Sequence, residues 1–91
     1  MLLKLLAVSA ILLIHGEYAW IEKPSYKTLF GASCCGYSDC FVISTSEALQ
    51  VRVGDSILLN EQAVRVNKIY DSEDAQSWAC YTGCLFIGLQ V

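Results

Sequence analysis

The cysteines constrain this chain more than any other feature, because all five fall in two short clusters. The first cluster holds Cys34, Cys35 and Cys40, and the second holds Cys80 and Cys84. A chain of 91 residues forms at most one domain. A core of that size supplies only about 3–5 kcal/mol of stability. A disulfide that closes a loop of roughly 45 residues adds about 4 kcal/mol in the chain-entropy model. Disulfides between the clusters would therefore stabilise the fold about as much as its core does.

The amino-terminal segment has the pattern of an export signal. Lys4 precedes an apolar run over residues 5–14, which has the length of a signal-peptide core and is shorter than the ~20 residues of a spanning helix. We therefore expect a signal peptide over residues 1–16, cleaved after Gly16, and a single cysteine-stapled domain over residues 17–91. This organisation predicts a periplasmic or secreted protein. An uncleaved signal anchor that tethers the protein to the membrane is the alternative.

In an exported chain, the cysteines predict two structural disulfides that join the two clusters. Two disulfides among five cysteines allow fifteen arrangements, and the sequence does not choose among them. The adjacent Cys34 and Cys35 would be strained if bonded to each other, so each has a different partner or one stays free. Among the arrangements we expect the one in which Cys35 and Cys40 bond with the carboxy-terminal pair. An odd cysteine in a secreted chain is typical of intermolecular pairing, which would give a disulfide-linked dimer.

A thiol-based redox protein, or a protein that handles the soft metals Zn²⁺ or Cu⁺, is the alternative from another class. The spacings Cys-x4-Cys and Cys-x3-Cys differ from the two-residue knuckle of zinc sites, and the chain contains no Cys-x-x-Cys redox motif. We therefore expect no bound metal and no cofactor.

The middle of the chain predicts a β-meander. Apolar and polar residues alternate over residues 49–53, which is the period of a half-buried strand. Gly54 and Asp55 form a two-residue link typical of a type II′ hairpin, and the partner strand is expected over residues 56–60. A further strand over residues 63–67 follows a second turn.

Shorter elements flank this meander. Residues 41–43 predict a short buried strand, and residues 44–47 have the capping-box spacing that begins a helical turn. The apolar segment that begins at Trp78 predicts one closing strand, on which Cys80 and Cys84 face the same side. The expected fold is mainly β, a small disulfide-stabilised antiparallel meander or partly open barrel of four to five short strands, preceded by an N-terminal signal helix.

Between the signal and the first cysteines, residues 17–30 mix aromatic and charged side chains without a regular period. Pro24 prevents a helix from running through this segment, so we expect an irregular arm. Its aromatic residues Tyr18, Trp20 and Tyr26 have two interpretations. They form either an exposed contact surface for a partner or a cover that folds back over the small core.

Several kinds of chemistry are disfavoured by the residues. His15 is the only histidine and lies in the predicted signal, so the domain would lack the imidazole that Ser/His/Asp and Cys/His catalysis require. We therefore expect no enzyme and no catalytic residue. The acidic loop at residues 71–77 lacks the ligand spacing of a calcium loop. A net charge of −3 without a Lys/Arg cluster argues against nucleic-acid binding, and against membrane contact other than through the signal segment.

The cysteine pattern resembles that of small exported bacterial proteins, mostly alphaproteobacterial, of uncharacterised function. The matching features are Cys34-Cys35, Asp39-Cys40, a Ser72-to-Asp74 loop, Cys80 and Cys84-Leu85-Phe86. Those proteins have His where this chain has Trp78, and they contain more proline. The resemblance implies export and a disulfide framework and brings no assigned activity. We therefore expect a structural or binding protein of the cell envelope, with an unknown protein or envelope component as its partner.

Overall fold

The computed structural model describes residues 19–35 and 40–89, and the predicted signal at 1–16 lies outside these residues. No described helix is long and apolar enough to cross a membrane. The mainly β class is confirmed, with six short strands in the described part of the chain. The elements are η1 (Ala19–Glu22, a 3-10 helix), β1 (Cys40–Ile43), α2 (Thr45–Ala48), β2 (Ser56–Leu59), β3 (Gln62–Arg65), β4 (Lys68–Asp71), β5 (Ser77–Cys80) and β6 (Cys84–Ile87).

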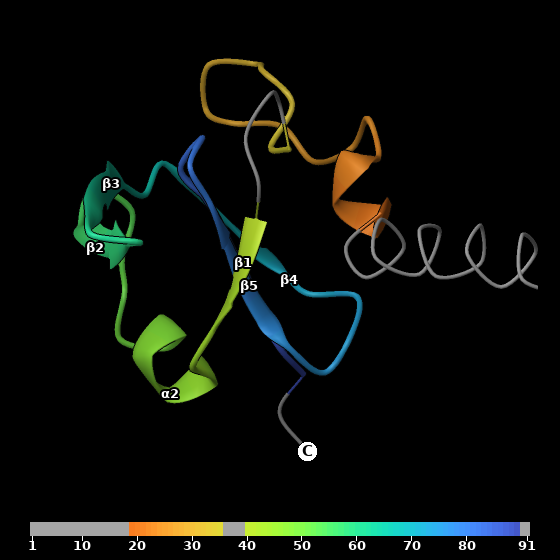
Figure 1. Cartoon of the computed structure of the whole chain (residues 1–91). Helices are drawn as coiled ribbons and strands as arrows, with labels where there is room; N and C mark the ends of the chain where they lie inside the picture. Colours follow the sequence, from red (N-terminus) through yellow and green to blue (C-terminus); the bar gives the residue numbers. More distant parts are fainter. Residues whose placement is uncertain (1–18, 36–39, 90–91) are drawn as a thin grey trace, which may run out of the picture.

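Four of the strands form one sheet in the order β1-β5-β6-β4, in which β4 and β6 are parallel and the other pairs antiparallel (Figure 1). The prediction of one closing strand from Trp78 is wrong, because β5 and β6 are separate strands of a hairpin. Gly83 has a φ of 99° and donates its N–H to the carbonyl oxygen of Cys80 over 2.9 Å, which reverses the chain. Cys80 and Cys84 therefore lie on neighbouring strands.

The other two strands, β2 and β3, form a separate antiparallel hairpin. Its turn contains Asn60 and Glu61 with φ values of 47° and 65°, as a type I′ turn requires. The predicted strands at 56–60 and 63–67 are confirmed in β2 and β3, each one residue shorter, and β3 begins one residue earlier than predicted.

The predicted strand at residues 49–53 is wrong, and so is the hairpin at Gly54 and Asp55. Residues 49–53 form turns held by local hydrogen bonds. Gly54 instead donates its N–H to the carbonyl of Val66 over 2.7 Å, and Val66 donates its N–H to the carbonyl of Asp55 over 2.8 Å, next to the β2–β3 pair. Asp55 donates its N–H to the carbonyl of Arg52 over 3.0 Å, and its carboxylate accepts from the N–H of Arg52 over 2.9 Å. Gly54 has the expected positive φ of 103°, but within this turn.

The two short elements before that turn follow the sequence closely. The strand expected at residues 41–43 is β1, although it is only partly buried, since Val42 is 54% exposed. The expected helical turn is α2. The Ser44 hydroxyl accepts from the N–H of Glu47 over 3.4 Å, which satisfies one of the donors at the start of the helix.

The four-stranded sheet is the middle layer of the fold, because alternate side chains of a strand point to opposite faces. Residues 19–35, which comprise the described part of the arm and the first two cysteines and are called the arm from here on, lie on one side of the central strands. The β2–β3 hairpin lies on the other side (Figure 1). Each face has its own core. The core on the arm side consists of Ile21, Cys34, Cys35, Cys40, Trp78, Cys80, Cys84 and Phe86. The core on the hairpin side consists of Ala48, Leu59, Val64, Val66, Ala79 and Leu85.

Candidate functional site

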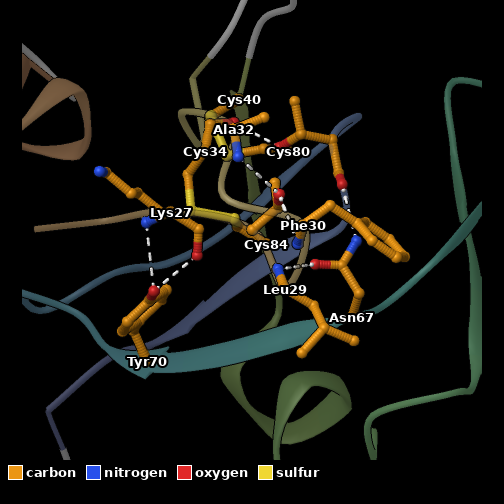
Figure 2. Close-up of a disulfide and its surroundings, with 12 residues drawn as sticks. Lys27, Leu29, Phe30, Ala32, Cys34, Cys40, Asn67, Tyr70, Cys80 and Cys84 are labelled. Carbon is orange, nitrogen blue, oxygen red and sulfur yellow. Dashed lines mark hydrogen bonds between the residues drawn. A yellow bond between two sulfur atoms is a disulfide. The ribbon is translucent and has the colours of Figure 1, made fainter. Parts of the chain in front are cut away.

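Two disulfides join the cysteine clusters, as predicted in outline. Cys40 and Cys80 lie directly opposite each other on β1 and β5, with Cα atoms 4.1 Å apart, and form one of them. Cys34 bonds to Cys84 with Cα atoms 5.6 Å apart, so the expectation that Cys35 would bond to the carboxy-terminal pair is wrong (Figure 2).

The backbone around Cys34 explains this choice. Cys34 donates its N–H to the carbonyl of Tyr26 over 3.1 Å, and its own carbonyl accepts from the hydroxyl of Thr82. These bonds place Cys34 beside the β5–β6 turn, whereas the side chain of Cys35 lies near Glu22. Cys35 lies outside both disulfides, is buried, and has its sulfur 3.9 Å from Oε1 of Glu22.

Two aromatic residues of the arm pack against the core. Trp20 and Tyr26 are half-buried, and their ring centroids lie 5.0 and 5.2 Å from that of Phe86 in edge-to-face geometry. Tyr26 also contacts Tyr70 at 5.1 Å. These rings cover the core on the arm side, which is the second interpretation that the sequence leaves open. Tyr18, the third residue of the predicted surface, lies outside the described residues.

Asp74 connects the arm to the sheet through both tryptophans. Its carboxylate accepts from the indole N–H of Trp20 over 3.3 Å and from that of Trp78 over 3.2 Å. Burial opposes ionisation of this carboxyl, but the hydrogen bonds from Gln76, Ser72 and the two indoles outweigh it and hold the pKa of Asp74 below its ordinary value. Asp74 is therefore a structural acceptor in its charged form.

The neighbouring Glu73 makes a second connection to the arm. It accepts from Nζ of Lys23 over 2.6 Å and from the hydroxyl of Tyr26. The hydrogen bond from Lys23, followed by that from Tyr26, holds the pKa of Glu73 below its ordinary value. The hydrogen bond between Tyr26 and Glu73, with burial and the nearby charges of Glu73 and Tyr70, raises the pKa of Tyr26 to about 12.

Beyond these contacts the arm ends in a loop with an apolar tip. Phe30 is 84% exposed and Leu29 is 62% exposed. The N–H of Leu29 donates to Oδ1 of Asn67 over 3.0 Å, and the hydroxyl of Tyr70 accepts from and donates to the backbone of Lys27 (Figure 2). The loop is thus fastened to β4 and to the residue before it.

A groove of about 340 Å³ lies on the opposite side of the sheet, between α2 and β2. It is lined by Ile43, Glu47, Val51 and all four residues of β2. Because consecutive side chains of a strand point to opposite faces, a cavity lined by four consecutive residues runs along the edge of the strand. The other edge of β2 pairs with β3, and no described strand pairs with the edge at the groove.

Sequence reasoning missed this groove. The signal that could have indicated it is the run Ile57, Leu58 and Leu59, because a two-stranded hairpin buries only one face and three consecutive apolar residues cannot all point to it. Leu59 is buried, Ile57 is half-buried, and Leu58 is 75% exposed.

Within residues 19–35 and 40–89, no group of three or more His, Cys, Asp or Glu side chains is placed to hold a metal ion. The chain matches no protein-family model, no curated protein and no solved structure. The resemblance to small exported bacterial proteins therefore stays a prediction.

Proposed function

We propose that this protein is a non-enzymatic binding module of the bacterial cell envelope or exterior, and that its binding site is the groove between α2 and β2. One observation carries this proposal. An apolar groove runs along an open strand edge on a scaffold that two disulfides stabilise. Pockets that bind ligands in proteins have volumes of about 300–1,000 Å³, and this groove lies at the lower end of that range.

The location in this proposal rests on the cysteines and the amino-terminal segment. Disulfides persist in oxidising compartments such as the periplasm and the exterior of the cell. Together with the export signal expected at residues 1–16, they favour a periplasmic or secreted protein, or one tethered by an uncleaved signal. Mass spectrometry of the amino terminus of the native protein would distinguish cleavage from tethering.

The binding function is tested with two matched variants. Leu58→Asp places a charge in the groove, and Leu29→Asp places the same charge on the loop of the arm. Both leucines are mostly exposed, so both variants should fold with nearly wild-type stability. Each protein is immobilised and exposed to envelope extract. We expect the wild type and Leu29→Asp to bind envelope protein that Leu58→Asp does not bind. Equal recovery with the wild type and both variants would contradict the proposal.

The alternative, a thiol-based redox or soft-metal protein, needs reduced thiolates. Four of the five cysteines form disulfides in this structure. Thiol counting by mass spectrometry on the native protein separates the two classes. One alkylated cysteine is expected for the binding module, whereas three or more reduced thiols with stoichiometric Zn²⁺ or Cu⁺ would favour the alternative.

A further inference from the structure

We infer that the groove takes an extended peptide segment that adds to β2 as a third strand and places a Lys or Arg side chain near Glu47. This inference rests on the proposed binding function and specifies its ligand. The peptide would belong to a partner protein, and it would carry apolar side chains at alternate positions.

The backbone of β2 supports strand addition. In an antiparallel pair, alternate residues direct their N–H and C=O groups away from the partner strand. Along the four residues of β2, half of the backbone groups therefore lie at the edge that faces the groove. Proteins usually protect such an edge with charged residues or proline, and Ser56–Leu59 contains neither. A peptide strand would satisfy these groups by main-chain hydrogen bonds.

The walls of the groove indicate which side chains the peptide would carry. Ile43, Val51 and Ile57 are half-buried members of the core on this face of the sheet, so each exposes part of an apolar side chain to the groove. Leu58, which is 75% exposed, adds apolar surface at the edge. Side chains on one face of an added strand recur at every second residue, so alternate apolar residues would contact this surface.

The charge of the groove indicates the remaining feature. Glu47 is the one charged residue that lines it, and Glu47 forms no ion pair with any described residue. The chain as a whole has a net charge of −3. A basic side chain on the peptide would therefore be favoured over an acidic one. A second copy of this chain is a poorer occupant, because a two-fold contact would bring a second Glu47 to the same edge.

The test uses the intact, disulfide-bonded protein and synthetic peptides. The probe is an octapeptide of alternating valine and threonine with one central arginine, and a second peptide has glutamate at that position. Binding is followed by amide chemical shifts of Ser56–Leu59 and by calorimetry. We expect the arginine peptide to shift these amides and to bind about three- to tenfold more tightly than the glutamate peptide, as exposed charge pairs allow. Glu47→Gln should reduce this preference to less than about twofold, and Glu61→Gln, outside the groove, should leave it unchanged.

Strand addition is tested by methylating backbone nitrogens of the peptide, which leaves the protein unaltered. Amides of an added strand face β2 at every second residue. One alternating set of N-methyl groups should therefore weaken binding at least about tenfold, and the other set should change it less than about threefold.

Each outcome has a distinct meaning. Equal effects of the two methylated sets, with the groove amides still shifted, would overturn strand addition and leave the binding function standing. If no peptide shifts the groove amides and Leu58→Asp binds envelope protein like wild type, both proposals fail. If the β2 amides change with protein concentration alone and sedimentation shows a dimer, the occupant is a second copy and the peptide is excluded.

Discussion

Gly83 lies against the side chain of Asn67, at the point where the β5–β6 turn meets the start of β4. The carbonyl of Gly83 accepts from the N–H of Asn67 over 2.9 Å, and Nδ2 of Asn67 donates to the carbonyl of Thr82 over 2.9 Å. Oδ1 of Asn67 accepts from Leu29 of the arm. One asparagine therefore connects the turn, the parallel strand and the arm.

This relationship predicts a large effect of Gly83→Ala. A Cβ at this position would overlap the Asn67 amide and lie 2.6 Å from the carbonyl oxygen of Arg65, in a backbone conformation with positive φ. We expect a loss of at least about 3 kcal/mol in the free energy of unfolding, measured with urea. Gly54→Ala is the matched control, because Gly54 also has a positive φ but no neighbouring atom within 4 Å, so its loss should be about 1–2 kcal/mol. Equal losses would show that the contact with Asn67 does not matter.

The two disulfides are nested, and this predicts non-additive effects of their removal. Their sequence separations are 50 and 40, so with one bridge intact the other closes a ring of only about ten residues. Replacing either pair by alanine should cost about 3 kcal/mol, whereas replacing both should cost about 7 kcal/mol and unfold the protein. Urea unfolding of the two double variants and circular dichroism of the quadruple variant measure these effects. A quadruple variant that stays folded would contradict this reasoning.

Acid should weaken the connection that Asp74 makes with the arm. Because the folded-state pKa of Asp74 lies below its ordinary value of 3.8, its ionised form stabilises the fold above that pH, and this contribution is lost as the pH falls further. Asp74→Asn should lower the free energy of unfolding at pH 7 by about 1–2 kcal/mol, through weaker acceptance from the two indoles. The difference from wild type should shrink below pH 3.8. Asp71→Asn, an exposed position, is the control, and a pH-independent difference would contradict the role given to Asp74.

Alkaline titration should identify Tyr26 among the tyrosines. Its pKa is raised to about 12, first by the hydrogen bond to Glu73. A group whose pKa rises on folding stabilises the fold below its ordinary pKa of 10.0, and this contribution is lost as the pH rises towards the folded value. In a tyrosinate absorbance titration, Glu73→Gln should return the pKa of one tyrosine towards about 10. Glu61→Gln should leave the titration unchanged. An unchanged titration in Glu73→Gln would mean that the bond to Glu73 does not govern Tyr26.

The features that could be predicted depend on short stretches of chain. Ser44 and Glu47 are three residues apart, so their capping contact forms within one turn and α2 appears where the spacing indicates. The strands β2 and β3 are likewise neighbours in sequence, joined by a two-residue turn. The strand predicted at residues 49–53 has the alternation of a strand but no partner to pair with. Hydrogen bonds between Arg52 and Asp55, which are only three residues apart in sequence, form in place of strand pairing.

The candidate groove could not be predicted, because its walls come from β1, α2 and β2 and meet only in the folded chain. The positions of Trp20 and Tyr26 had two interpretations for a similar reason. Aromatic residues in an irregular segment bind a partner or cover a core according to what lies beside them. In this fold they lie against Phe86, more than 50 residues away in sequence.

The sequence alone determined that this chain is mainly β and that disulfides join its two cysteine clusters, since strand alternation and cysteine spacing are local properties. The tertiary structure decided that Cys34 rather than Cys35 bonds to Cys84, that β6 pairs in parallel with β4, and that one edge of β2 stays open. These outcomes depend on which surfaces pack together across the sheet. Adjacent cysteines have the same chemistry, and the contacts that the folded chain gives each of them, such as those of the Cys34 backbone with Tyr26 and Thr82, distinguish them.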